Sequence, residues 1–164
     1  MPDTGAGRRA RLRVLAVAAV VLAADQLTKW WALEALDDGP VHVGWTLDLQ
    51  LTFNTGTAFS LGRDLGPVIA LVAAGVVVAL ARSRLATVSA ATSACVGLVL
   101  GGAVGNLSDR AFRAGGDGFL GGAVVDFVDL GWWPVFNVAD AAIVVGAIGV
   151  VVFGWREPDA DPTA

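Results

Sequence analysis

Long apolar runs without any charged residue constrain this chain more than any other feature of its sequence. Leu85–Leu107 contains no Asp, Glu, Lys or Arg, and neither does Leu65–Ala81. A helix needs about 20 consecutive apolar residues to cross the hydrocarbon core of a bilayer. Charged residues make up 16% of the chain, whereas soluble domains carry about 25%. The sequence therefore predicts an all-α membrane protein with several spanning helices.

Four spanning helices are expected, packed as a bundle in a single membrane domain. The first follows an arginine-rich head, and its apolar part, Val14–Ala24, resembles the core of a secretory signal. We expect this segment to stay uncleaved as the first helix, because the pattern continues beyond it. The polar tails, residues 1–7 and 157–164, are expected to be disordered. The predicted spans within residues 1–164 are Leu12–Leu33, Leu65–Ala81, Leu85–Leu107 and Pro134–Trp155.

Basic residues indicate the orientation of these helices. The arginines before the first helix fall on the same side as Arg82 and Arg84, and Arg156 ends the fourth helix there too. By the positive-inside rule this side is cytoplasmic, so both termini are expected in the cytoplasm. The two long connections, about residues 34–64 and 108–133, would then face outward.

The first long connection has the pattern of a β-structure. Apolar side chains occupy every second position from Val41 to Phe53, with polar residues such as His42, Asp48 and Gln50 between them. A period of two indicates a strand or a hairpin with one apolar face. We expect a small extracytoplasmic sheet that rests on the bilayer, cradles a peptide or simply caps the helices.

Asp140 is the unusual residue of the fourth predicted helix. An ionisable side chain inside a bilayer costs about 2.5–3.5 kcal/mol even on the lenient insertion scale, so it indicates function. With Pro134 in the first turn, Asp140 would lie about 9 Å deeper, or roughly two turns. Asn137 shares its helix face and can orient the carboxyl group. A structural acid paired with Arg or Lys is the alternative interpretation.

A second carboxyl group precedes this helix. Asp126 lies among apolar residues in the loop before the fourth span, and Asp129 follows three residues later. In extended backbone the two side chains point to opposite faces. The residues alone do not decide which of them faces the helices.

Two carboxyl groups within hydrogen-bonding reach would give the chemistry of an aspartyl protease. They cannot comfortably both ionise, so one keeps a proton and the pair titrates as a unit. The charged group then accepts a proton from an attacking water, and the protonated group donates to the developing oxyanion. Because Cys95 and His42 are the only residues of their types, a zinc site of ordinary composition is not expected. No cofactor is expected, and the net charge of −4 without a basic patch argues against a nucleic-acid partner.

Other polar residues could support such a pair. Asp25 and Lys29 are four residues apart, so they share a helix face and are expected to form an ion pair. Asn106, Asp109 and Arg110 cluster where the third helix leaves the membrane. The segment Asn54-Thr55-Gly56 is typical of a turn. The alternative interpretation is that the amide side chain of Asn54 binds the peptide backbone of a substrate. Glycines at a spacing of four in the third span predict close helix packing; they are Gly97, Gly101 and Gly105.

Five short blocks of the sequence occur in an order that is typical of one known family. They are Asp25–Lys29, Asn54–Phe59, Gly101–Arg110, Val124–Phe127 and Phe136–Asp140. Over nearly its whole length the chain resembles the lipoprotein signal peptidases, or type II signal peptidases, of bacteria. Ser108 and Thr57 depart from the small or apolar residues expected there, and neither touches the proposed chemistry.

The resemblance implies an aspartyl endopeptidase of the inner membrane, with its active site near the outer leaflet. It assigns the catalytic pair to Asp126 and Asp140 and makes Asp129 a neighbour. The implied substrate is a prolipoprotein in membrane lipid, cut just before its diacylglyceryl-cysteine, and the peptide antibiotic globomycin is implied to occupy the same site. Supporting or substrate-binding positions of the family fall on Asp25, Lys29, Asn54, Gly56, Asn106, Asp109, Arg110 and Asn137.

Two other classes of protein fit parts of the pattern. A small proton-coupled transporter would also bury a carboxylate, but at mid-membrane and with access from both sides. Here the polar residues crowd toward one end of the predicted helices, which favours a one-sided site. In a structural assembly factor the acids would merely pair with Lys29, Arg110 or Arg113.

Overall fold

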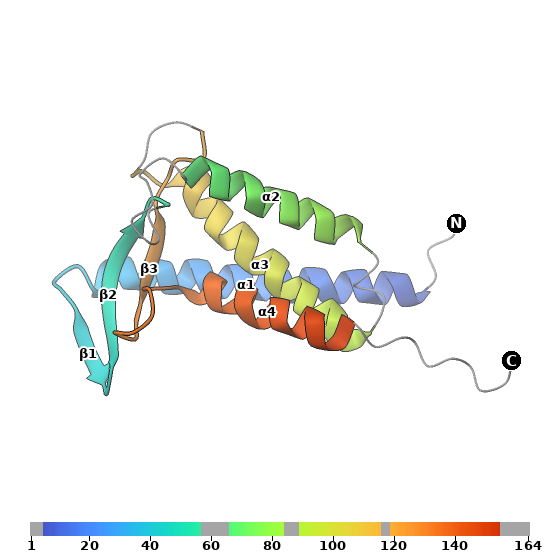
Figure 1. Ribbon diagram of the computed structural model, residues 1–164, viewed down its shortest axis with the longest axis horizontal. Coiled ribbons are helices and arrows are strands. Elements are labelled where there is room, and N and C mark those ends of the chain that lie inside the picture. The colour runs from blue at the N-terminus through green and yellow to red at the C-terminus, as the bar shows by residue number, and fades with distance from the viewer. Residues whose placement is uncertain (1–4, 57–65, 84–88, 116–118, 155–164) are drawn as a thin grey trace, which may run out of the picture.

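Four helices form an elongated bundle that carries a small antiparallel sheet at one end (Figure 1). The computed structural model describes residues 5–56, 66–83, 89–115 and 119–154. The start of α1 and the end of α4 lie at the end of the bundle opposite the sheet. The helices are α1 (Gly5–Ala35), α2 (Gly66–Arg82), α3 (Ala90–Phe112) and α4 (Val138–Gly154), and the strands are β1 (Val41–Gly44), β2 (Leu47–Asn54) and β3 (Val124–Asp129).

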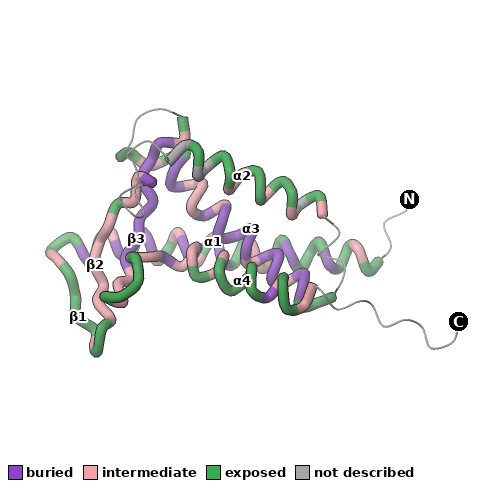
Figure 2. Tube along the Cα trace, in the orientation of Figure 1, coloured by how far each residue is buried: buried purple, intermediate pink, exposed green. Residues whose placement is uncertain are grey.

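Helix α3 is the centre of the bundle and packs against the other three helices. Its glycines permit this packing, as predicted from their spacing. A Cβ added at Gly101 would lie 2.7 Å from the backbone oxygen of Ala18 in α1, and one at Gly97 would lie 2.8 Å from Val17. Buried residues accordingly concentrate along α3 and in β3 (Figure 2).

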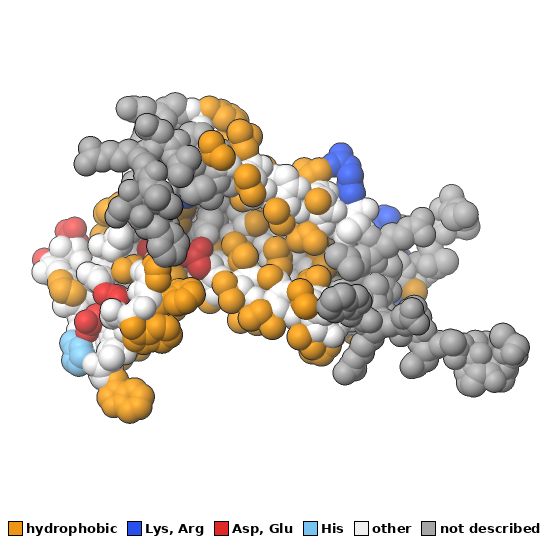
Figure 3. Space-filling view, viewed as in Figure 1, with side chains coloured by type: hydrophobic (Ala, Val, Ile, Leu, Met, Phe, Trp, Pro, Cys, Tyr) orange, Lys and Arg blue, Asp and Glu red, His pale blue; other side chains and the backbone are white. Residues whose placement is uncertain are grey.

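The outer surface of the bundle is apolar. Large exposed hydrophobic side chains run along α2 and α4, and Figure 3 shows hydrophobic side chains spread over the helical part of the molecule. Such continuous apolar surface is typical of contact with lipid or a partner. Within the described residues, only α3 has both the length and the apolar character needed to cross a membrane. Helix α4 and Leu71–Leu80 of α2 are apolar but shorter.

Several helix boundaries differ from the prediction, and α3 continues to Phe112 beyond the predicted end at Leu107. Helix α4 begins at Val138 and not at Pro134, because hydrogen bonds with Val128 hold Phe136 in extended backbone. Phe136 N donates to Val128 O at 3.0 Å, and Val128 N donates to Phe136 O at 2.9 Å. Helix α3 begins at Ala90, where Ser89 Oγ caps it by accepting from Thr92 N at 3.0 Å. The expected disorder of residues 1–7 is wrong for residues 5–7, which start α1; residues 1–4 and 157–164 lie outside the described part.

The predicted β-structure is a hairpin, and it is joined by a third strand. Strands β1 and β2 meet at a turn where Trp45 has a φ of 54°, and the sheet order is β1-β2-β3. Asp126 lies in β3 opposite Thr52 of β2, so its assignment to a loop was wrong. The sheet is fixed to the end of α1 by a small apolar core of Ala32, Leu36 and Phe127.

Candidate active site

Asp140 and Asn137 together form the N-terminal cap of α4. Asn137 Oδ1 accepts from Asp140 N at 2.9 Å, and Asp140 Oδ2 accepts from Asn137 N at 3.2 Å. This reciprocal pair is a capping box, which satisfies two backbone donors that a helix start leaves free. Asp140 therefore lies in the first turn of α4, and its predicted position two turns into the helix is wrong. The carboxyl group sits at the sheet end of the bundle.

Asp126 reaches the same place from β3. Its side chain is 2% exposed and accepts two amide hydrogen bonds. Asn137 Nδ2 donates to Oδ1 at 2.7 Å, and Asn54 Nδ2 donates to Oδ2 at 3.2 Å. Asn137 thus contacts both acids, through its side chain on one side and its backbone on the other. The prediction that Asn54 forms a turn is confirmed as well, because Asn54 Oδ1 accepts from Gly56 N at 2.9 Å.

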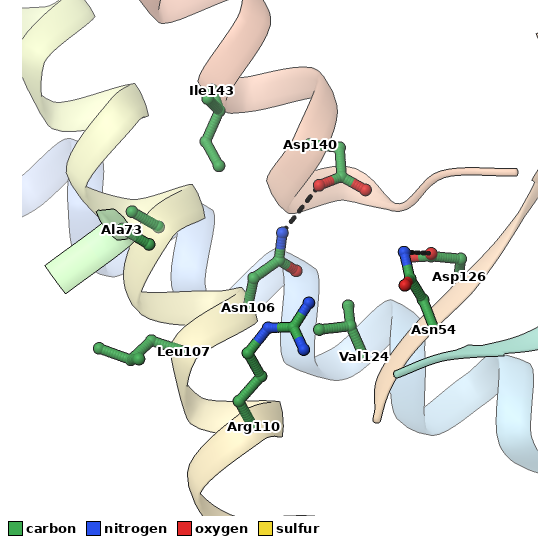
Figure 4. Close-up of a pocket in the computed structure, with 10 residues that line it drawn as sticks. Asn54, Ala73, Asn106, Leu107, Arg110, Val124, Asp126, Asp140 and Ile143 are labelled. Carbon is green, nitrogen blue, oxygen red and sulfur yellow. Dashed lines mark hydrogen bonds between the residues drawn. The ribbon is translucent and has the colours of Figure 1, made fainter. Parts of the chain in front are cut away.

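A cavity of about 260 Å³ opens between these side chains. Figure 4 shows Asp126 on β3 and Asp140 on α4 on two sides of this cavity, with Arg110 reaching toward it from α3. One part of its wall is polar, and the other part is apolar. The polar lining residues are Asn54, Asn106, Arg110, Asp126 and Asp140, and the apolar ones are Ala73, Ala103, Leu107, Val124 and Ile143.

The surroundings of Asp126 favour its protonated form. Burial, followed by the negative charge of Asp140, raises the pKa of Asp126 from 3.8 to about 6. The hydrogen bonds from Asn54 and Asn137 and the charge of Lys29 oppose this rise in pKa. A carboxyl group whose pKa is raised in this way keeps its proton to higher pH than an ordinary aspartate, which suits a general acid.

Asn106 makes hydrogen bonds with Asp140, Asn137 and Lys29. Its Nδ2 donates to Asp140 Oδ1 at 2.7 Å (Figure 4). Its Oδ1 accepts from Asn137 Nδ2 at 3.1 Å and from Lys29 Nζ at 2.9 Å. Because both ends of the amide are engaged, its orientation toward Asp140 is fixed.

Arg110 is buried in the cavity wall without a full set of partners. The residue is 6% exposed, and among the described residues its Nη1 is the buried side-chain nitrogen that has no hydrogen-bond partner. Leaving a buried donor unsatisfied costs about 1–3 kcal/mol, and more for a charged group. Its guanidinium group points into the cavity (Figure 4), where a ligand atom could accept the hydrogen bond.

The predicted pairing of Asp25 with Lys29 is confirmed, at 2.9 Å, and Lys29 also pairs with Asp109 at 2.8 Å. Within the described residues, no ion pair reaches Asp126 or Asp140, contrary to the pairing expected of an assembly factor. Asp129 lies apart from the cavity, where it accepts hydrogen bonds from Gln50 and from Gly131 N.

The structure adds contacts that sequence reasoning did not find. Gln26 Nε2 donates to Asp25 and Asp109, and Arg113 Nε donates to Asp109 Oδ1 at 2.8 Å. The apolar wall, including Ala73 and Ile143, was also missed. Of these residues, only Gln26 could have been singled out from the sequence, because it lies inside the block Asp25–Lys29. Thr57 lies outside the described residues.

Comparisons with known proteins agree with one another. Residues 17–156 match the family model described as signal peptidase (SPase) II. The chain is 48% identical to the lipoprotein signal peptidase of Rhodococcus jostii, covering 91% of this chain and 76% of that protein. It is also 48% identical to the lipoprotein signal peptidase of Mycobacterium avium, covering 94% and 86%.

A solved structure described as a bacterial membrane enzyme has the same fold, with a TM-score of 0.70. It is 21% identical, and the match covers 90% of this chain and 94% of that one. A second structure of the same description matches with a TM-score of 0.70 and 23% identity.

Proposed function

Because the chain belongs to the signal peptidase II family, a family of membrane proteases, we propose that Asp126 and Asp140 are its catalytic pair. The observation that carries this proposal is the placement of both carboxyl groups on one cavity, joined through Asn137. The raised pKa of Asp126 supports it, because the group then keeps a proton to higher pH than an ordinary aspartate.

The proposed reaction is hydrolysis of a peptide bond by water. The ionised aspartate accepts a proton as the water oxygen attacks the scissile carbonyl carbon, and the protonated aspartate donates to the carbonyl oxygen. The tetrahedral intermediate then collapses and the C–N bond breaks. The leaving amine takes a proton from the aspartic acid that was protonated by the water, and a hydroxyl group of the intermediate returns its proton to the other aspartate as the carbonyl re-forms. No covalent intermediate is needed, and the carboxyl groups return to their starting protonation state.

Arg110 fits this reaction as a substrate-binding residue. Its unpartnered Nη1 lies on the same cavity as both aspartates. A peptide carbonyl oxygen of the substrate would satisfy this donor and remove the cost of its burial. A guanidinium group is also always charged, so the interaction would persist throughout catalysis.

The substrate proposed is a prolipoprotein that carries a diacylglyceryl-cysteine, cut just before that cysteine. The four helices would span the inner membrane, with both termini in the cytoplasm and the site at the outer leaflet. Acidic side chains gather at the sheet end in Figure 3 and basic ones at the other end, which agrees with this orientation. Five exposed tryptophans in or near the sheet suit the outer interface; they are Trp30, Trp31, Trp45, Trp132 and Trp133.

A cleavage assay with matched peptides tests the substrate proposal. The purified protein in lipid vesicles is given a prolipoprotein peptide with and without diacylglycerol on its cysteine, and products are identified by mass spectrometry. We expect one cut before the lipidated cysteine and much slower cleavage of the other peptide. Equal cleavage of both peptides, or a cut at another bond, would contradict the proposal. Globomycin should inhibit the reaction competitively if it occupies the same cavity.

A further inference from the structure

Lys29 of α1 is buried beside α3, close to the starts of β3 and α4 that carry Asp126 and Asp140. Its side chain is 0% exposed. The ammonium nitrogen lies 2.9 Å from Asp25 Oδ2, 2.8 Å from Asp109 Oδ2 and 2.9 Å from Asn106 Oδ1. An ammonium group has three donors, so all three are used by these partners.

Each carboxylate that binds Lys29 also holds the backbone next to one of the proposed catalytic residues. Asp25 Oδ1 accepts from the backbone nitrogen of Ala139 at 3.0 Å, and Ala139 immediately precedes Asp140. Asp109 Oδ2 accepts from the backbone nitrogen of Val125 at 3.2 Å, one residue before Asp126. The two acids therefore fix the start of α4 and the start of β3 respectively.

The third partner of Lys29 acts on a catalytic side chain directly. Because Asn106 Oδ1 accepts from Lys29, its Nδ2 is turned toward Asp140 Oδ1 at 2.7 Å (Figure 4). Buried carboxylates without a balancing cation would be strongly unfavourable. Lys29 supplies that cation for Asp25 and Asp109 together, and each of these side chains also accepts from a backbone amide.

We propose that Lys29 is a positioning residue that sets the placement of Asp126 and Asp140 relative to each other. It does so through Asp109 and Val125 on one side, and through Asp25, Ala139 and Asn106 on the other. This inference rests on the proposed function of the two aspartates. Lys29 does not line the cavity, so it acts through these partners and not on the substrate.

Replacement of Lys29 by methionine keeps an unbranched side chain, one heavy atom shorter, and removes its charge and donors. A displacement of about 1 Å in a catalytic group can cost about 100-fold in rate. For Lys29→Met we expect kcat to fall by about that factor, while KM changes less, because Lys29 touches neither Arg110 nor the apolar part of the wall in any described contact. The assay uses the full-length protein in lipid vesicles and the lipidated peptide substrate.

Arg113→Met is the matched control. Arg113 also pairs with Asp109, at 2.8 Å, but it binds Oδ1, and among the described residues no hydrogen bond or ion pair joins it to Asn106 or Asp25. Its loss removes a cation from the same acid without disturbing the link to Asp140. We expect kcat to fall by less than a factor of ten. An equal loss in both variants would contradict a specific role for Lys29.

The pH profile distinguishes positioning from simple support of the fold. The charged groups that influence Asp126 are Asp140 on α4, Lys29 on α1 and Arg110 on α3. Removal of the Lys29 cation takes away an influence that lowers the pKa of Asp126. The limb of the kcat profile governed by Asp126 should therefore move to higher pH in Lys29→Met, and stay in place in Arg113→Met.

A charge-compensated variant addresses the case in which Lys29→Met does not fold. In Lys29→Met/Asp109→Asn the asparagine oxygen can still accept from Val125 N, and the charge of the cluster is unchanged. A folded single or double variant with wild-type kcat and an unmoved pH limb would overturn the inference. Unfolding of both variants would also overturn it, since Lys29 would then serve folding and not placement. If the wild type itself does not cleave, the proposed function fails instead.

Discussion

Asn137 makes hydrogen bonds with both proposed catalytic residues. Its side-chain oxygen caps α4 through Asp140 N, and its side-chain nitrogen donates to Asp126 Oδ1. One fully buried amide thus starts a helix and orients an acid from a different element. These two tasks have different chemical requirements, because capping needs only an acceptor whereas the contact with Asp126 needs a donor of that length.

Substitution of Asn137 should separate the two tasks. Asn137→Ala loses the cap and the amide, so we expect a stability loss of about 0.5–2 kcal/mol and loss of cleavage. Serine is also a good N-cap residue, so Asn137→Ser should keep most of the thermal stability and still lose cleavage. Thermal unfolding and cleavage rates of the two variants provide the test. A cleavage rate in Asn137→Ser close to that of the wild type would show that the amide is dispensable.

The raised pKa of Asp126 predicts a pH dependence of stability. Its pKa in the folded protein is about 6, against 3.8 for the unperturbed group. Between these values the native state binds more protons than the unfolded state, so stability from this residue falls as pH rises through that window. Asp126→Asn should therefore gain stability relative to the wild type at pH 7.5 compared with pH 4. A difference in melting temperature that is the same at both pH values would contradict this.

At the scale of elements, the glycines of α3 let neighbouring helices and side chains approach its backbone closely. A Cβ added at Gly105 would lie 2.6 Å from Asp25 Oδ2, so the absence of a side chain there is what lets Asp25 reach Ala139 N. Glycine packing and placement of the site are therefore coupled. The same helix carries Asn106, Asp109 and Arg110 toward the cavity and its supporting network.

Gly105→Ala should consequently impair both stability and activity. Overpacking of a tight contact typically costs about 1–3 kcal/mol, and here it would push against the carboxyl group of Asp25. Gly75→Ala on α2 is the control, because a Cβ there meets nothing within 4 Å. Alanine favours helix over glycine by about 1 kcal/mol, so the control should be neutral or slightly stabilised. Similar melting temperatures and cleavage rates for the two variants would refute the coupling.

At the scale of the whole molecule, much of the architecture could be predicted from local patterns. Charge-free runs indicated the apolar helices, the period of two indicated the hairpin, and the spacing of Asp25 and Lys29 indicated their pairing. Each of these features depends on residues close together in the sequence. The polar clusters also met at one end of the bundle, as their positions along the helices suggested.

Features that depend on pairing between separate segments of the chain could not be predicted in this way. The start of α4 was misplaced because Pro134 suits a first helical turn, yet pairing of Phe136 with Val128 keeps this segment extended. Asp126 was assigned to a loop because its partner strand lies more than 70 residues earlier in the chain. The unpartnered donor of Arg110 likewise became visible only once its neighbours were placed.

The catalytic pair is the central claim, and cleavage by three asparagine variants tests it most directly. Asp126→Asn and Asp140→Asn keep the size of each side chain but cannot hold or release the proton that hydrolysis needs. Asp129→Asn is the matched control, since Asp129 lies in the same strand as Asp126 and away from the cavity. All three should insert into membranes and purify like the wild type. We predict that the first two abolish cleavage of the diacylglyceryl prolipoprotein peptide while Asp129→Asn retains most of it, and near-normal cleavage by either of the first two would contradict the account.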